Sequence, residues 1–299
     1  MNLCILTNEP FPHGLAATNR FISYASVIAK ENNVKVLIVK PTEFGEIRNK
    51  ERMGTFNKVD FKYLWDDTEW PINSNKLNKL KIITIAYSRL IVFFLKNKFD
   101  SVIVVSNNLL LNYVALFLAK VSKTKIYLEK TEKPPYMKNR QNFIYEKLHS
   151  FSYRSFTGII VMTFELAKIF KRIGQKNIFH LPMTVDLSRF SNLKLKRLNK
   201  KLVFTYCGGG NYERDGLKNI IDAMIELIQY NKNFKFEIYG PDVDTLYFER
   251  IKKRIKKKYI ENYICFLGQK NYSEIPQILF NSDFLIMCPT ENFSSGGFP

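Results

Sequence analysis

The sequence predicts an α/β protein made of two doubly wound domains, each a mostly parallel sheet covered by helices. Short apolar runs typical of buried strands alternate with segments whose apolar residues recur at helical spacing. The alternation is interrupted by a polar, basic stretch near residues 186–200 and then begins again. A chain of 299 residues is long enough for two cores. We therefore place the first domain at residues 1–190, a linker at 191–200 and the second domain at 201–299.

In the first half, five apolar runs are expected to be strands: NLCILT, VKVLIV, SVIVVS, KIYLEK and GIIVMT. The segments NRFISYASVIAKEN and FIYEKLHSFSYRSF carry apolar residues at helical spacing and predict helices. The most apolar stretch, residues 81–96, is interrupted by Arg89 and is shorter than the ~20 apolar residues that span a bilayer. We expect it to form a buried or surface-docked helix.

In the second half, four expected strands each end in glycine or proline: LVFTYCG, FKFEIYG, ICFLG and DFLIMCP. Open parallel sheets bind ligands at the carboxyl ends of their strands, so two such domains predict a binding cleft between them. The doubly wound plan commonly has about six strands, and the second domain shows fewer. We therefore expect this domain to be incomplete.

The charge of the chain is strongly positive, +19 in total. Residues 1–190 hold 29 Lys and Arg against 15 Asp and Glu, whereas residues 191–299 hold 17 against 12. Such a field attracts nucleic acid, an anionic membrane leaflet or a phosphorylated substrate, although an ordinary solvated surface explains it equally well.

The amino terminus and the cysteines indicate a cytoplasmic protein. The first ten residues lack the basic and apolar regions of a signal peptide. The four cysteines lie in or beside separate strand-like runs, without metal-ligand spacing: Cys4, Cys207, Cys265 and Cys288. We expect buried thiols in a reducing compartment.

The segment YCGGGNYERDG, residues 206–216, joins an expected strand to an expected helix. Free backbone N–H groups and the positive end of the helix dipole make such a turn an anion site, most simply for phosphate. The dinucleotide fingerprint would need glycine where Glu213 stands, and no Gly-Lys-Ser/Thr follows for a P-loop. Arg214 offers a fork of donors that suits two phosphate oxygens. A plain turn with a solvated arginine remains the alternative.

Five segments in order resemble the retaining glycosyltransferases of family 4, which have the GT-B architecture of two facing Rossmann-like domains. The segments are PFPHGLAATNR, HLPMTVDLSRF, YCGGGNYERDGLKNIIDA, EIYGPD and ICFLGQKNYSEIPQILFNSDFLIMCPTE. Within the second, a short signature before the linker is matched by Pro182, Val185, Asp186, Arg189 and Phe190.

The resemblance implies transfer of a sugar from a nucleotide-diphosphate donor to a glycan or lipid-linked acceptor, with retention and without a metal or other cofactor. It implies donor contacts from both domains: Gly14, Gly208, Gly209, Arg214, Lys218, Gly240, Gln269 and Lys270. Of these, Arg214 and Lys218 would face the diphosphate, and Gln269 and Lys270 would border the nucleobase.

Three further side chains are candidates for the chemistry. Glu291 resembles the first acid of the family's Glu-x7-Glu pattern, but Pro299 stands at the second position, so we expect a truncated chain. Glu132 ends a first-domain strand, where an acceptor-side or catalytic carboxylate is expected. His13 lies on the first cleft loop, where a neutral imidazole could bond a sugar hydroxyl.

Two charged patterns favour simpler interpretations. Asp242 and Asp244 spell a D-x-D metal motif, but we expect a helix-start cluster instead. Residues 250–258 are predicted to be a helix with a charged outer face and with Ile251 and Ile255 inside. They lack the aromatic residues of a nucleic-acid site, so we expect no nucleic-acid partner.

The second functional hypothesis is a non-catalytic basic protein or inactive fragment that binds anionic membranes or nucleic acid. For the enzyme we expect a cytoplasmic location, peripheral on the inner face of the cell membrane.

Overall fold

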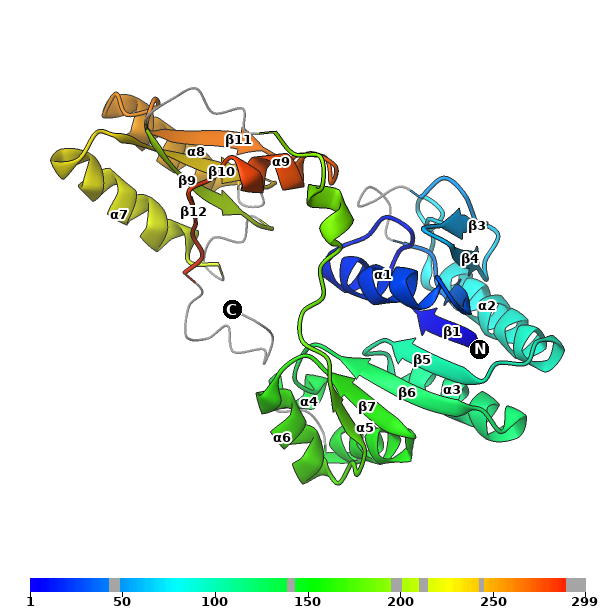
Figure 1. Cartoon of the computed structure of the whole chain (residues 1–299). Helices are drawn as coiled ribbons and strands as arrows, with labels where there is room; N and C mark the ends of the chain where they lie inside the picture. The colour runs from blue at the N-terminus through cyan, green and yellow to red at the C-terminus, as the bar shows by residue number, and fades with distance from the viewer. Residues whose placement is uncertain (43–48, 139–142, 195–200, 210–214, 242–244, 289–299) are drawn as a thin grey trace. The chain divides into compact units, whose positions relative to one another are not determined.

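A computed structural model describes residues 1–42, 49–138, 143–194, 201–209, 215–241 and 245–288 (Figure 1). The chain divides into two compact units between Val185 and Asp186. The predicted boundary after residue 190 coincides with the end of a short 3-10 helix, Leu187–Phe190. That helix belongs to the second unit because the Arg189 guanidinium lies 3.6 Å from the Tyr272 ring and donates to its carbonyl oxygen.

The first unit is built on an eight-stranded sheet of order β3-β4-β2-β1-β5-β6-β7-β8. Its strands are β1 (Asn2–Thr7), β2 (Asn33–Ile38), β3 (Met53–Phe56), β4 (Val59–Tyr63), β5 (Ser101–Val105), β6 (Lys125–Lys130), β7 (Gly158–Val161) and β8 (Ile178–His180). All neighbours pair in parallel except β3 and β4, which form an antiparallel hairpin. The five strands predicted from the sequence are confirmed, and β3, β4 and β8 were not predicted.

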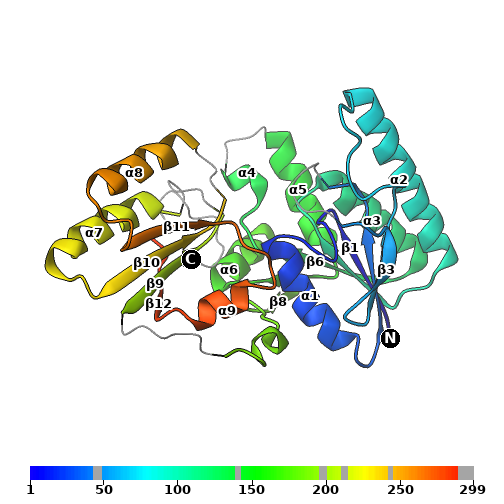
Figure 2. The same ribbon diagram turned by 90° about the horizontal axis from the view of Figure 1, so that it is seen from above.

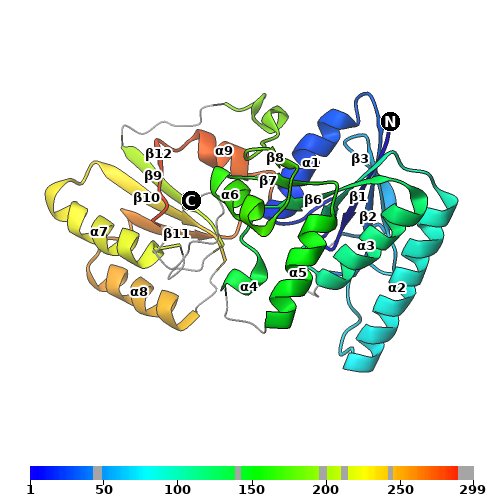
Figure 3. The same cartoon turned by 90° about the horizontal axis from the view of Figure 1, so that it is seen from below.

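Helices cover both faces of this sheet. Its helices are α1 (Ala16–Ile28), α2 (Lys76–Lys96), α3 (Leu109–Ser122), α4 (Pro135–Lys138), α5 (Phe143–Ser155) and α6 (Phe164–Ile173). Alternate strand residues pack into two clusters, one shared with α1 and the other with α2, α3, α5 and α6. Figures 2 and 3 show α2, α3 and α5 in a row on one side of the sheet. This two-sided burial explains why the strands are continuous apolar runs.

The second unit contains a four-stranded parallel sheet of order β11-β10-β9-β12. Its elements are β9 (Leu202–Cys207), α7 (Leu217–Tyr230), β10 (Phe234–Tyr239), α8 (Thr245–Lys257), β11 (Ile264–Gly268), α9 (Ile275–Phe280) and β12 (Phe284–Leu285). The four predicted strands are present, but β12 has two residues only, because it pairs with β9 at Phe204 and Thr205 alone. Ile251 and Ile255 are buried on α8, as predicted.

Two expectations about apolar segments can be compared with this fold. Within the described ranges, no helix is long and apolar enough to cross a membrane. The cysteines are free thiols, and Cys4 is buried. The expectation of burial is wrong for Cys288, which is exposed because it follows the short edge strand β12.

Candidate active site

The strand order of the second sheet reverses at β9, and the glycine loop follows this strand. From β9 the chain proceeds to β10 and β11 on one side, whereas β12 lies on the other. Ligands of open α/β sheets bind outside the carboxyl ends of the strands at such a switch point. The topology therefore places the end of β9, at Gly208 and Gly209, at the preferred ligand position of this unit.

Glycines terminate three neighbouring strands at this edge. The Gly208 amide donates to the Tyr239 carbonyl oxygen, and the Gly240 amide donates to the Gly268 carbonyl oxygen, each over 3.1 Å. Two of the predicted donor residues, Gly208 and Gly240, are thereby brought together. Gln269, exposed, follows β11 at the same edge.

The remaining predicted residues of this edge that the structure describes are Gly209 and Lys270. Gly209 is exposed and follows Gly208 directly, and Lys270 is half-buried two residues beyond β11. Because glycines stand at the ends of adjacent strands, their backbone atoms are accessible at this edge.

Gly208 has a structural role that the sequence did not reveal. A Cβ atom on Gly208 would lie 2.4 Å from the Tyr206 hydroxyl oxygen. That hydroxyl donates to the Asp215 carboxylate over 2.7 Å, and both side chains are buried. The absence of a side chain at Gly208 therefore makes room for a bond that ties the two ends of the glycine loop together.

Gly216 fixes the start of α7 against the segment after β12. It is the N-cap of α7 with φ +68°, and a Cβ atom there would lie 1.6 Å from the Cys288 carbonyl oxygen. Lys218 is exposed in the first turn of α7, which contains no acid. A cation is unfavourable beside the positive end of a helix dipole, and a bound anion would offset this cost.

Several predicted residues lie outside the described residues. They are Arg214, Glu291, Glu213, Asp242 and Asp244. Their assigned roles stay predictions.

In the first unit the switch point lies between β1 and β5, and the loop after β1 carries His13 and Gly14. The His13 amide donates to the Asn49 side-chain oxygen, and the Asn49 amide group donates back to the His13 carbonyl oxygen, each over 2.9 Å. The exposed imidazole stands edge-on to Phe56, with ring centroids 5.7 Å apart. Asn49 therefore fixes the loop and leaves the imidazole accessible.

Gly14 is enclosed by its own loop. A Cβ atom there would lie 2.1 Å from the Thr18 hydroxyl oxygen and 2.7 Å from the Pro10 carbonyl oxygen. Thr18 donates to that carbonyl over 2.8 Å, which closes the turn into α1. The absence of a side chain at Gly14 therefore makes room for this turn.

Glu132 is half-buried two residues beyond β6. Because β6 is two places from β1 in a parallel sheet, Glu132 and His13 lie at the same carboxyl edge. The predicted acceptor-side residues therefore share one edge of the first unit.

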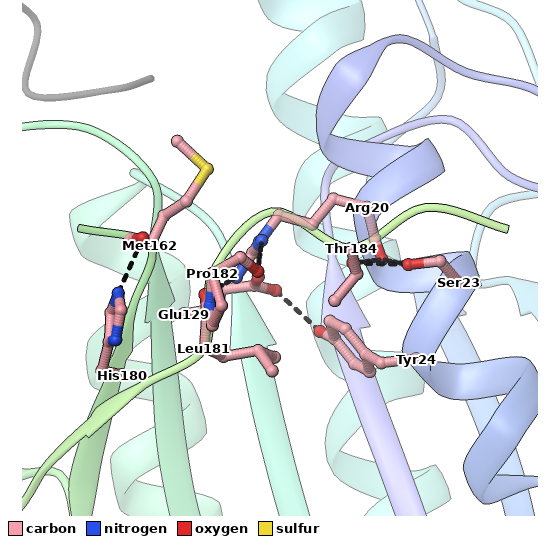
Figure 4. Close-up of polar contacts among 9 residues, drawn as sticks. All are labelled: Arg20, Ser23, Tyr24, Glu129, Met162, His180, Leu181, Pro182 and Thr184. Atoms are coloured by element: carbon pink, nitrogen blue, oxygen red, sulfur yellow. Dashed lines mark hydrogen bonds and ion pairs between the residues drawn. The ribbon is translucent and has the colours of Figure 1, made fainter.

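A buried ionic cluster below this edge was missed in the sequence (Figure 4). The Arg20 side chain, 2% exposed, donates from Nε to Glu129 over 2.6 Å. Its two terminal nitrogens donate to the carbonyl oxygens of Pro182 and Leu181 over 2.7 and 2.6 Å. Glu129 also accepts from Tyr24 over 2.6 Å. The cluster thus joins α1, β6 and the last segment of the first unit.

The electrostatic consequence appears at Tyr24. Burial, and next the neighbouring Glu129 carboxylate, raise the pKa of the Tyr24 phenol well above its ordinary value. The phenol therefore stays a donor to Glu129, and Thr184 bonds Ser23 of the same helix over 2.5 Å. The only signal in the sequence was that Arg20 and Glu129 stand next to apolar residues of a predicted helix and a predicted strand.

A second buried polar group lies beside the cluster's strand. Lys130, the last residue of β6, is buried and donates to the Asn107 side-chain oxygen. His149 on α5 is fully buried with Nδ1 3.0 Å from the Tyr153 hydroxyl oxygen. Burial, and next the charge of Lys130, lower the pKa of His149 to about 4. The imidazole is therefore neutral at physiological pH.

Among the residues that the structure describes, no three His, Cys, Asp or Glu side chains converge as metal ligands.

Residues 190–298 match the family model described as Glycosyl transferases group 1. A search of curated proteins gave no significant sequence match. Among solved structures, Anabaena HepE in complex with UDP superposes with a TM-score of 0.66 at 13% identity, over 95% of this chain and 73% of that chain. The fold is that of the GT-B glycosyltransferases.

Other GT-B structures superpose equally well. Sucrose-phosphate synthase from Thermosynechococcus elongatus gives a TM-score of 0.66 at 10% identity, over 95% of this chain and 75% of that chain. The catalytic domain of starch synthase IV from Arabidopsis thaliana, bound to ADP and acarbose, gives 0.65 at 8% identity, over 95% and 77%. At these identities the likeness shows the GT-B fold and carries no substrate assignment.

Proposed function

We propose that this protein is a glycosyltransferase that moves a sugar from a nucleotide-diphosphate donor to a glycan or lipid-linked acceptor. The observation that carries the proposal is the group of glycine-ended strands β9, β10 and β11 beside the start of α7. They lie at the switch point of a sheet within residues 190–298, the part that matches the group 1 model. Backbone N–H groups and a helix terminus are suited to a diphosphate.

Neighbouring structures support a nucleotide donor. The HepE structures contain UDP or UDP-glucose, and the structure of the starch synthase domain contains ADP. For this chain we assign the diphosphate to Gly208, Gly209 and Arg214, with Lys218 one turn into α7. We assign the nucleobase edge to Gln269 and Lys270, and Gly240 passes beside the nucleotide.

The chemistry we propose is retaining and metal-independent, which rests on the resemblance to family 4. The bond between the anomeric carbon and the diphosphate oxygen breaks, and the acceptor oxygen attacks the same face. The leaving diphosphate takes the acceptor proton. Arg214 and the glycine N–H groups stabilise the charge that develops on the diphosphate, which is the largest contribution a site of this kind can make.

On the acceptor side we assign His13 and Glu132, which share the carboxyl edge of the first sheet, and Glu291 orients the donor sugar. The positive charge of residues 1–190 supports a cytoplasmic protein that is peripheral on the inner face of the cell membrane. A lipid-linked acceptor would be met there.

The test is calorimetric titration of UDP, GDP and ADP with EDTA present. We expect at least one nucleotide to bind, and Arg214→Ala to weaken it by roughly 1.5 to 3 kcal/mol, as for hydrogen bonds to charged groups. Lys232→Ala, a change of an exposed cation beyond α7, should have no effect. Strict dependence on Mg or Mn would contradict metal independence.

Two further measurements test the role of Arg214 and the retaining mechanism separately. An equal loss for the bare nucleoside would refute the role of Arg214, because a nucleoside has no diphosphate. If transfer is observed, NMR of the product anomer tests retention directly. Failure of all three nucleotides to bind would overturn the proposed function.

A further inference from the structure

Three neighbouring helices of the first unit have a second apolar side that faces away from the sheet. Helix α2 buries Ile82, Ala86, Leu90 and Phe94 against the core. Nevertheless, other large apolar side chains of the same helix are exposed: Leu77, Leu80, Ile91 and Leu95. Together with Thr84 and Ser88, these residues follow one another in steps of three or four, which places them on one side of the helix.

Helices α3 and α5 repeat this arrangement beside α2. On α3 the exposed apolar residues are Leu110, Phe117 and Val121. On α5 they are Phe143, Ile144, Leu148 and Phe151. The Tyr113 hydroxyl of α3 donates to the Leu148 carbonyl oxygen over 2.9 Å, so these helices are in direct contact. We call the exposed sides of α2, α3 and α5 together the outer helical surface.

The outer helical surface is almost free of acids. Across the three helices there are eight Lys and Arg residues and one acid, Glu146. Helix α2 alone carries five of the cations, and of these Arg89 is paired with Asp66 at 2.8 Å. The surface therefore combines a positive charge with many exposed aliphatic and aromatic side chains.

A groove of about 610 Å³ borders this surface between α2 and the end of β4. Val92 and Lys96 of α2 line it, as do Arg52 and Lys62 from the hairpin side. The positive character of the surface thus continues beyond α2 toward the edge of the sheet.

We propose that the outer helical surface docks on a bilayer that contains anionic lipid. Exposed leucine, isoleucine and valine gain by entering the acyl boundary, and the flanking lysines gain by approaching anionic head groups. The proposal makes specific the membrane association included in the proposed function, but it does not require donor binding.

Two other occupants fit less well. A second copy of the chain would meet this surface with the same surface, because two-fold interfaces are self-complementary, and like charges would then oppose each other. A nucleic acid would match the charge and could stack on exposed rings such as Phe117 and Phe151. It would gain little, however, from the exposed leucine, isoleucine and valine side chains that make up most of this surface.

The experiment is co-sedimentation of the full chain with phosphatidylcholine vesicles, with and without phosphatidylglycerol. We expect binding only with phosphatidylglycerol, and a marked loss when NaCl rises from about 0.1 M to about 1 M. Replacing Lys76, Lys81 and Lys96 by Gln should weaken binding about fivefold per lysine, and on the order of 100-fold together.

Matched controls distinguish this surface from general charge. The triple variant Lys253→Gln, Lys256→Gln, Lys257→Gln removes the same charge from the exposed side of α8 and should leave binding unchanged. Leu95→Gln on α2, where the side chain is 68% exposed, should weaken binding about tenfold. Val27→Gln on α1, at 62% exposure, should not.

Three results would overturn the proposal. They are equal binding to neutral vesicles, equal losses for the α2 and α8 variants, and a dimer in light scattering that Leu95→Gln dissociates. Nucleotide calorimetry on the same preparations reports the donor site, so failure of membrane docking and failure of the proposed enzyme are seen separately.

Discussion

At the scale of single residues, the ion pair and hydrogen bonds of Arg20 are expected to matter most for stability. One guanidinium neutralises Glu129 and satisfies two carbonyl oxygens, and both side chains of this ion pair are buried. Removing one partner of a buried ion pair leaves the other charge buried and unpaired, which is destabilising. Replacing both partners can leave the free energy of unfolding nearly unchanged.

We therefore expect Arg20→Met to lower the free energy of unfolding of the first unit by about 3 to 5 kcal/mol. The double variant Arg20→Met, Glu129→Gln should recover part of this loss, because no charge is then stranded. Both tryptophans, Trp65 and Trp70, lie in the first unit, so tryptophan fluorescence in urea reports this unit selectively.

The control for this prediction is the exposed pair of Arg89 with Asp66. Arg89→Gln should cost no more than about 1 kcal/mol, as for surface ion pairs. Equal losses for Arg20→Met and Arg89→Gln would mean that the buried cluster adds no special stability.

His149 predicts a pH dependence of stability. Its folded pKa of about 4 lies below the usual value, so as the pH falls the unfolded chain takes up the proton first. The stabilisation of the folded state by neutral His149 is fully present above the unfolded pKa of about 6.5, and it is lost as the pH falls toward 4. Between pH 7 and 5 the loss should be about 1 to 2 kcal/mol.

The measurement is tryptophan-detected urea unfolding at both pH values for the native chain and for His149→Gln, which should show a smaller loss. His180→Gln serves as the control, since His180 is exposed. An NMR titration of the imidazole provides an independent reading, and an ordinary pKa there would refute the argument.

At the scale of elements, two glycines with the same backbone conformation form a natural comparison. Gly216 and Gly268 both have φ +68°. A Cβ atom at Gly216 would collide with the Cys288 carbonyl oxygen, whereas one at Gly268 meets nothing within 4 Å. Any difference between alanine variants therefore reports crowding at the start of α7 and not the φ angle.

Gly268→Ala should cost about 1 to 2 kcal/mol, the penalty of the left-handed region alone. Gly216→Ala should cost clearly more and should also abolish nucleotide binding, because the start of α7 and the segment after β12 must move apart. Circular dichroism in urea and calorimetry with UDP provide both readings. Indistinguishable variants would show that the contact with Cys288 is not retained in solution.

Sequence patterns predicted the buried strands well and the edge strands poorly. Central strands are apolar on both faces, which makes them visible as runs. The hairpin of β3 and β4 was missed because its turn uses Asn57 and Lys58 at φ 49° and 65°, without the glycine that usually marks such a turn. The edge strands β8 and β12 were also harder to define, since they are short and largely exposed.

At the scale of the whole molecule, the sequence predicted the GT-B fold and the positions of the candidate site loops, but not their supports. Glycines at strand ends can be read directly from local sequence. In contrast, Arg20 and Glu129 are 109 residues apart, and His13 and Asn49 are 36 apart. Such contacts depend on which strands become neighbours, and local periodicity contains no information about that.

The division into two units predicts an unequal response to ligand. UDP at about 100 times its dissociation constant should stabilise the unit that binds it by about 2.7 kcal/mol. If the donor site belongs to the second unit, the transition seen by circular dichroism should include a component that shifts, whereas the tryptophan transition of the first unit should not. A shift of the tryptophan transition by the full amount would contradict this assignment.

The contacts of Arg20 also set which positions evolution can vary. Two of its three acceptor residues, Leu181 and Pro182, are used through main-chain oxygens, which every amino acid supplies. These two bonds therefore place no demand on the side chains at 181 and 182, although Pro182 also belongs to the signature shared with family 4. Arg20 and Glu129 have no such freedom and should be replaced only together. A saturation library selected for folded protein should accordingly be permissive at 181 and restrictive at 20.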